Sequence, residues 1–272
     1  MENLEGEGIL HWRSHEFEEI WFEAEINIST LEVRKFTDEA IAIRLASILK
    51  EAKKLNPDFL HSDRSVTCKT KLTFSRNWGL GSSSTLISLI SQWSDTDPFQ
   101  LLNSTMGGSG YDIACANNNG PLVYQLVNHK PIKNPIDFKP AFANRLYFVY
   151  LGRKQDSTQE VQRFNAISSI RESDIEYVSN LTYRMIAAAD QTEFNGYLLE
   201  HEKLIASIID KKPVKNERFR DFAGEIKSLG AWGGDFVLAS SMKEEKETKR
   251  YFEDKGLNSI IQFNDLVLQK SL

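Results

Sequence analysis

Apolar and polar residues alternate in three stretches near the start of the chain, at residues 8–13, 18–29 and 64–74. Alternation of β-favouring side chains is typical of strands that bury one face, so the first two stretches predict a hairpin and the third predicts a further strand. Between them, apolar residues recur at helical spacing from Ile41 to Leu49. This spacing predicts a helix that Thr37 or Asp38 caps and that ends at Asn56, directly before a proline.

The middle of the chain predicts both helices and strands. Residues 86–93 place apolar side chains on one stripe of a helix, and residues 95–106 predict a turn followed by a second short helix. Strands are expected at 121–128 and 145–151, where β-branched and aromatic residues are concentrated.

A proline-rich stretch separates the two predicted strands. Residues 130–140 contain three prolines, which disfavour both helices and central strands. We therefore expect a subdomain boundary within 130–144, with an N-terminal subdomain at 1–141 and a C-terminal subdomain at 142–272.

The second half of the chain is richer in helical patterns. These patterns dominate from 157 to 228, and a strand is expected at 236–240, a charged helix at 243–255 and a return to β structure at 258–269. The chain shows no internal repeat and no low-complexity tract. The predicted fold class is α+β.

Composition and charge narrow the function classes. The 272 residues are 41% apolar, and 33 Lys and Arg against 38 Asp and Glu give a formal charge of −5. This mildly acidic balance argues against a nucleic-acid partner, although a small anionic ligand needs only a local positive site. Two cysteines, Cys68 and Cys115, are too few for a disulfide framework and are expected to be buried thiols.

Neither targeting nor metal-ligand patterns stand out in the sequence. The first residues are acidic where a signal peptide is basic, and no apolar run approaches a membrane span. The five histidines are scattered without metal-ligand spacing. We expect a cytoplasmic protein that acts on a small molecule, with no nucleic-acid or membrane partner and with a homodimer left open.

The stretch NWGLGSSSTLISLIS at 77–91 places two glycines and three serines in front of a predicted helix. Glycines allow close backbone approach, and we expect Ser82–Ser84 to occupy the cap and first turn of the helix. A helix N-terminus has unpaired amide groups and a partial positive charge, which suit a phosphate. The stretch lacks the lysine of a Walker loop, and an ordinary serine-capped turn is an equal alternative when the stretch is considered alone.

A second glycine-rich stretch, MGGSGYDIACA at 106–116, contains a loop that ends in the single acid Asp112. Phosphate repels a carboxylate in a loop that approaches an anion, so such an acid suggests a role in accepting a proton from an attacking hydroxyl. The alternative is that Asp112 only caps a short helix that begins at Ile113.

Two further stretches carry weaker indications. LGAWGGDFVLAS at 229–240 is a third glycine cluster, which by itself favours a tight bend into a strand. Lys154 and Ser157 offer a cation and a hydroxyl at a helix start, which suit a carboxylate or phosphate. A solvated basic loop with a serine cap is an equal alternative for these two residues.

Taken together, the glycine-rich stretches resemble the three motifs of the GHMP kinases, the family of galactokinase, homoserine kinase and the mevalonate-pathway kinases. The family's second motif, similar to G-L-G-S-S-A-A, is matched by Gly79, Leu80, Gly81, Ser82 and Ser83, with Ser84 and Thr85 in place of the alanines. The catalytic loop of phosphomevalonate kinases, similar to G-S-G-F-D-V-A, is matched at residues 108–114, where the chain also contains the G-Y-D-I-A string of a bacterial subfamily. The third motif, similar to G-A-G-G-G-G, is matched by Gly230, Ala231, Gly233 and Gly234, with Trp232 as a bulky departure.

The resemblance implies a two-subdomain α+β fold and phosphoryl transfer from ATP. The N-terminal subdomain would contain a left-handed β-α-β unit, and the C-terminal subdomain would be ferredoxin-like. Gly79–Ser84 would hold the ATP phosphates, Ser83 would help to bind Mg²⁺, and Asp112 would orient or deprotonate the acceptor hydroxyl. Substrate contacts are expected from the loop glycines and their neighbours, namely Gly108, Ser109, Gly110, Lys154, Ser157, Gly230, Gly233 and Gly234.

The sequence departs from the family pattern at two points. The first family motif, similar to P-G-K-x-x-L-x-G-E, has no clear counterpart, which is expected either of a truncated chain or of a degenerate member. The glutamate that often completes the Mg²⁺ shell is also missing, and Leu101 stands about where it would be expected.

The loop 108–114 is more similar to the mevalonate and phosphomevalonate kinases than to the sugar kinases. A small-molecule kinase of that type is therefore the expected function. Two alternatives are a diphosphomevalonate decarboxylase, whose D-A-G-P-N-like string we do not find, and a non-catalytic binder that keeps the fold.

Overall fold

The computed structural model describes residues 8–61, 64–128, 130–153, 160, 162–164, 166–167, 170–230, 232 and 235–268. The chain divides into two compact units. Unit 1 comprises residues 1–76, 80–118 and 122–135, and unit 2 comprises 77–79, 119–121 and 136–272. Each unit has its own hydrophobic core.

Unit 1 contains a four-stranded mixed sheet in the order β3-β2-β1-β4. Its strands are β1 (Ile9–Glu16), β2 (Glu19–Asn27), β3 (Val33–Phe36) and β4 (Val66–Leu72). β1 pairs antiparallel with β2 and parallel with β4. The hairpin and the third strand predicted from alternation are therefore confirmed.

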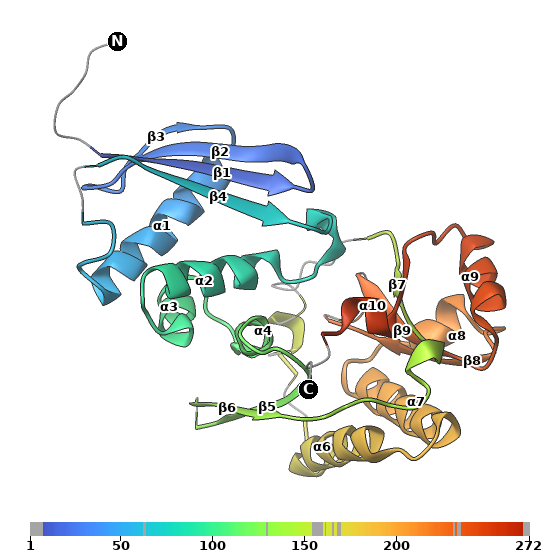
Figure 1. Cartoon of the computed structure of the whole chain (residues 1–272). Helices are drawn as coiled ribbons and strands as arrows, with labels where there is room; N and C mark the ends of the chain where they lie inside the picture. The colour runs from blue at the N-terminus through green and yellow to red at the C-terminus, as the bar shows by residue number, and fades with distance from the viewer. Residues whose placement is uncertain are drawn as a thin grey trace. The chain divides into compact units, whose positions relative to one another are not determined.

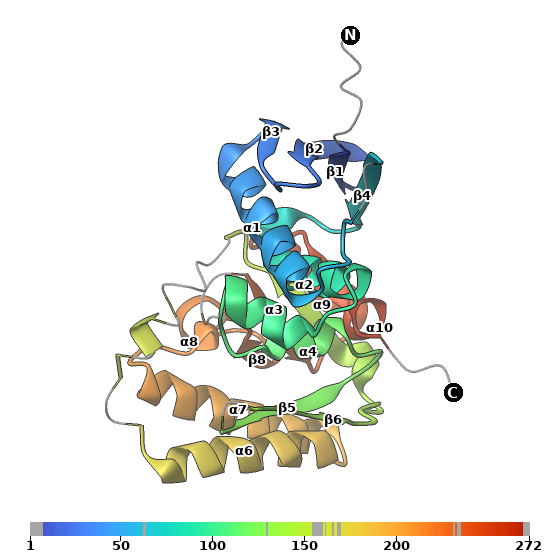
Figure 2. The same ribbon diagram turned by 90° about the vertical axis from the view of Figure 1, so that its left-hand side faces the viewer.

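The long helix of unit 1, α1 (Glu39–Leu55), lies against one face of this sheet (Figures 1 and 2). The Asp38 side chain accepts a hydrogen bond from the Ile41 amide at 3.0 Å and so caps the helix as predicted. The predicted end at Asn56, the C-cap residue, is also confirmed. Leu45, Ile48 and Leu49 are buried against the sheet, and this burial is the main source of stability for an amphipathic helix.

Three shorter helices and a hairpin complete unit 1. The helices are α2 (Ser82–Trp93), α3 (Pro98–Thr105) and α4 (Tyr111–Ala116), and the hairpin pairs β5 (Leu122–Val127) with β6 (Lys130–Pro135). The predicted helices at 86–93 and within 95–106 are confirmed. β6 lies in the proline-rich stretch where the subdomain boundary is expected, and its two prolines are tolerated because a two-stranded sheet has only edge strands.

Unit 2 contains a four-stranded antiparallel sheet in the order β10-β7-β9-β8. Its strands are β7 (Leu146–Tyr150), β8 (Gly224–Ser228), β9 (Phe236–Ser241) and β10 (Ile260–Gln262). Helices join β7 to β8 and β9 to β10, so the chain follows the β-α-β-β-α-β order of ferredoxin-like folds. The expectation of a ferredoxin-like C-terminal part is thus confirmed.

The helices of unit 2 are α6 (Glu172–Ala187), α7 (Gln191–Ile208), α8 (Val214–Arg218), α9 (Glu245–Glu253) and α10 (Phe263–Leu266). α6 and α7 lie side by side in both views (Figures 1 and 2). Two sequence expectations fail here. Residues 224–228 form β8 where a helical pattern was expected, and the β structure expected at 258–269 is limited to β10, because α10 follows at once.

Candidate functional site

The glycine-serine stretch begins α2 without a side-chain cap. Gly81 is the N-cap residue, with left-handed dihedrals of φ 73° and ψ 33°, and no side chain accepts a hydrogen bond from the first turn. The expectation that a serine supplies the cap is wrong, because Ser82–Ser84 are already the first three residues of the helix. The amide groups of this first turn have no side-chain partner and Ser83 is exposed, so both are available to an anion.

The second glycine-rich stretch forms the turn into α4. Gly110 is the N-cap residue in a left-handed conformation, α4 begins at Tyr111, and Asp112 lies in its first turn. The alternative that Asp112 caps a helix beginning at Ile113 is therefore wrong. The Tyr124 hydroxyl donates a hydrogen bond to the Ser109 carbonyl and so holds the turn against β5.

The environment of Asp112 shifts its protonation toward the neutral form. Reduced hydration around the carboxyl raises the pKa of Asp112 from its ordinary value. The residue is nevertheless exposed to solvent, so a ligand can reach it. A carboxylate with a raised pKa and an open approach suits a group that accepts a proton during a reaction.

A small polar network connects α2 with α4. The buried Ser88 hydroxyl of α2 donates to the Asn117 side-chain oxygen at 2.9 Å, and the Asn117 side-chain amide donates to the Ile113 carbonyl of α4 at 2.9 Å. Gln92 also donates to the Asn117 oxygen, at 3.3 Å. These contacts fix the helix that carries Asp112 relative to the helix that begins at the glycine-serine loop. Nothing in the sequence pattern predicted this link.

No group of three or more His, Cys, Asp or Glu residues that could hold a metal occurs in the part of the chain that the structure describes. Leu101 is fully buried in the core of unit 1. The expectation that both cysteines are buried is wrong for Cys115, which is exposed, and Cys68 is only partly buried, which is enough to raise the pKa of its thiol to about 11.

The third glycine cluster lies in unit 2, directly before β9. Gly230 has a positive φ of 58°, and the Trp232 carbonyl accepts a hydrogen bond from the Lys211 ammonium at 3.3 Å. The same ammonium pairs with Glu160 at 2.7 Å and so connects this cluster to the segment that follows Ser157 in sequence. Lys154, Ser157, Gly233 and Gly234 lie outside the described residues.

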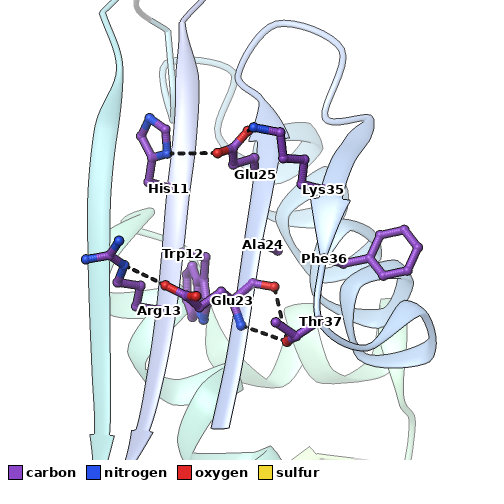
Figure 3. Close-up of a pocket in the computed structure, with 9 residues that line it drawn as sticks. All are labelled: His11, Trp12, Arg13, Glu23, Ala24, Glu25, Lys35, Phe36 and Thr37. Atoms are coloured by element: carbon purple, nitrogen blue, oxygen red, sulfur yellow. Dashed lines mark hydrogen bonds and ion pairs between the residues drawn. The ribbon is translucent and has the colours of Figure 1, made fainter. Parts of the chain in front are cut away.

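A shallow recess of about 260 Å³ lies on the face of the unit 1 sheet that α1 does not cover (Figure 3). Ion pairs cross it from Arg13 to Glu23 at 2.8 Å and from Lys35 to Glu25 at 3.0 Å. These charges are already paired and largely solvated, as expected of an open sheet face. None of the predicted site residues lines this recess.

Gly110 is a position where the loop requires glycine. A Cβ there would lie 2.8 Å and 2.9 Å from ring carbons of Phe99, and φ is +77°. We expect Gly110→Ala to lower the free energy of unfolding by about 2 kcal/mol or more, because backbone strain and a steric clash add. The measurement is urea unfolding.

Gly107 provides the matched control for Gly110. Its φ of +66° is similar, but a Cβ there would have no neighbour within 4 Å. Gly107→Ala should therefore show the strain alone and cost less. Equal losses in the two variants would contradict the assigned packing of Phe99 against Gly110.

Comparisons with known proteins agree with this architecture. A mevalonate kinase from Methanococcus jannaschii matches with a TM-score of 0.63 at 14% sequence identity, over 96% of this chain and 85% of that one. The Lin0012 protein from Listeria innocua matches with a TM-score of 0.63 at 15% identity, over 93% and 84%. L. major mevalonate kinase in complex with R-mevalonate matches with a TM-score of 0.53 at 14% identity, over 89% of each chain.

The chain matches no protein-family model, and the search of curated proteins found no match either. The fold is thus a two-unit α+β fold of the kind found in mevalonate kinases, as the sequence resemblance implied. Within the described residues, no helix is both long and apolar enough to cross a membrane.

Proposed function

We propose that the chain is a small-molecule kinase of the GHMP type, which transfers the γ-phosphate of ATP to an alcohol or phosphate acceptor. Two features of unit 1 together carry this proposal. The start of α2 at Gly81–Ser84 has no side-chain cap, and Asp112 lies on α4, a helix that hydrogen bonds connect to α2. Phosphoryl transfer to an alcohol uses both elements, an anion cradle for the phosphates and an acid that orients or deprotonates the attacking hydroxyl.

The residues of the loop fit a nucleotide phosphate chain. No side chain caps the first-turn amides of α2. The space beside Gly81 is also open, because a Cβ there would have no neighbour within 4 Å. Backbone and hydroxyl donors of the turn can therefore approach a ligand closely. Mg²⁺, when bound, would neutralise charge on the phosphates, and the hydroxyl of Ser83, an exposed residue of this loop, could contribute a ligand. With an alcohol acceptor, Asp112 would orient the attacking hydroxyl or accept its proton; an ionised phosphate acceptor has no such proton, so Asp112 would then act only in orientation.

The acceptor is proposed to be of the mevalonate or phosphomevalonate type. Support comes from the similarity of residues 108–114 to the loop of those kinases and from the mevalonate kinases among the structural matches. Product analysis with ATP and each acceptor tests the proposal. ADP with a phosphorylated product supports it, ADP with CO₂ identifies a decarboxylase, and nucleotide binding without turnover identifies a non-catalytic binder.

Ser83 provides a direct test of the nucleotide site. We expect Ser83→Leu to weaken ATP binding at least about tenfold, because the variant loses a hydroxyl donor to an anion and places an apolar side chain at the helix start. Calorimetric titration measures the affinity, and circular dichroism checks the fold.

Ser47→Leu is the control for Ser83, since Ser47 is also an exposed helical serine of unit 1 but lies in the middle of α1. It should leave ATP affinity unchanged. Unchanged affinity in a folded Ser83→Leu variant would exclude the α2 start as the phosphate site.

A further inference from the structure

Residues 77–79, directly before the glycine-serine helix start, pack on the strands of unit 2. The Tyr150 hydroxyl of β7 donates a hydrogen bond to the Asn77 carbonyl at 2.9 Å. The Trp78 ring packs edge-on against Phe236 of β9 at a centroid distance of 5.7 Å and lies 6.2 Å from Tyr150. The chain is therefore fixed within unit 2 just before it continues through Leu80 to α2.

Asp235 adds a contact that explains why residue 79 is glycine. A Cβ at Gly79 would lie 2.4 Å from the Asp235 carboxyl carbon and 2.6 Å and 2.7 Å from its oxygens. The Asp235 backbone is itself fixed, because its carbonyl accepts a hydrogen bond from the Leu151 amide at 2.8 Å. The carboxylate thus occupies the space next to the Gly79 α-carbon, where φ is +67°.

We propose that Asp235 is a positioning residue for the glycine-serine loop. Its side chain packs against Gly79 and sets the path of the backbone that leads into the phosphate-binding turn three residues later. This inference rests on the proposed kinase function, and it adds a role for the acid of the third glycine cluster. Holding a loop in its bound conformation strengthens binding by lowering the ordering cost.

Positioning and simple electrostatics predict opposite effects of removing this side chain. A carboxylate near a phosphate site repels the ligand, so loss of the charge alone should tighten nucleotide binding. Loss of a positioning contact should weaken binding instead. Asp235→Asn removes the charge but keeps the shape, whereas Asp235→Ala removes both.

Hydrogen exchange of the ligand-free protein tests the positioning role without reference to catalysis. We expect Asp235→Ala to raise amide exchange in peptides that cover 77–84, with little change elsewhere, and Asp235→Asn to raise it less. The control is Asp254→Ala in the same unit, because Asp254 is 71% exposed and pairs only loosely with Arg250 at 3.7 Å. Unchanged exchange at 77–84 in Asp235→Ala overturns the proposal, even if the protein is a kinase.

Nucleotide affinity provides the second readout. Asp235→Ala should raise the Kd for ATP roughly three- to tenfold, the effect expected when one ordered contact is lost, and Asp254→Ala should leave the Kd unchanged. Tighter binding in Asp235→Ala overturns the proposal. If the parent protein binds no nucleotide, the kinase function fails while the exchange experiment still decides the positioning role.

Two further comparisons separate positioning from other roles. Gly79→Ala should raise loop exchange strongly in the parent but less in the Asp235→Ala background, where the steric clash is gone and only the positive φ remains. Equal effects in both backgrounds contradict the contact. If Asp235→Ala and Asp235→Asn weaken Mn²⁺ binding to the nucleotide complex equally, with loop exchange unchanged, the carboxylate is a metal ligand and the positioning proposal is wrong.

Discussion

Asp112→Asn is expected to lower the rate of phosphoryl transfer by roughly 10²- to 10⁴-fold, the range typical of losing a general base. Asparagine has nearly the same shape as aspartate but cannot take up the proton of the acceptor hydroxyl. The substitution also removes a negative charge, so ATP affinity should hold or rise. Steady-state kinetics and calorimetric titration measure the two effects separately.

Asp97→Asn is the matched control for Asp112. Asp97 caps α3 in the same unit by accepting hydrogen bonds from the Phe99 and Gln100 amides at 2.8 Å and 2.9 Å. Asparagine caps helices about as well as aspartate, so this variant should remain active. If Asp112→Asn is also active within a few fold of the parent, Asp112 is not the proton acceptor.

The pH dependence of turnover follows from the direction of the Asp112 shift. Reduced hydration raises the pKa of Asp112, and a general base must be deprotonated to act. Activity should therefore fall on the acid side at a pH above the ordinary value of 3.8 for aspartate. The check is the pH profile of kcat for the parent enzyme.

The first half of unit 1 was predictable from sequence because its periodicity is strong and its end signals are local. Alternation defined β1, β2 and β4, and Asp38 and Asn56 marked the two ends of α1. Each of these features depends mainly on residues close in sequence. Local propensity and tertiary packing favour the same structure there.

β8 was not predictable because its pattern is weak. The strand GEIKS has one large apolar residue, Ile226, and begins with a glycine, which lowers β propensity. Its pairing with β9, between residues such as Ile226 and Ala239, is what makes it a strand. Long-range pairing of this kind leaves no periodic signal in a five-residue segment.

The candidate site shows the same division. The glycine and serine types at 79–84 and the acid at 112 indicated a phosphate loop and a proton acceptor, because those chemistries depend on residue type. The Gly81 cap, the link from Ser88 to Asn117 and the contact of Asp235 with Gly79 depend on three-dimensional packing. The sequence contains one indication that Asp235 belongs to the site, namely its position directly after the third glycine cluster.

Lys227→Met is expected to lower the free energy of unfolding by about 3–5 kcal/mol at neutral pH, the cost of breaking a buried ion pair on one side. Lys227 of β8 lies 3.8 Å from Glu202 of α7, whose side chain is only 3% exposed. Neither Glu202 oxygen makes a hydrogen bond of good geometry, and the donors beside it belong to Ser228 and Lys227. Removing the ammonium therefore leaves a buried carboxylate without its countercharge. Urea unfolding at pH 7 measures the loss.

The pH dependence and a double variant distinguish this electrostatic cost from lost packing. Burial raises the pKa of Glu202, so the folded protein takes up the proton at higher pH than the unfolded chain. The deficit of Lys227→Met should therefore shrink as pH falls from 7 toward the ordinary glutamate value of 4.5, because a neutral Glu202 needs no partner. Adding Glu202→Gln should recover part of the loss at pH 7, since the variant amide is uncharged and methionine fills much of the volume of lysine. A deficit that is independent of pH and is not reduced in the double variant would show that Lys227 contributes through packing of its alkyl chain alone.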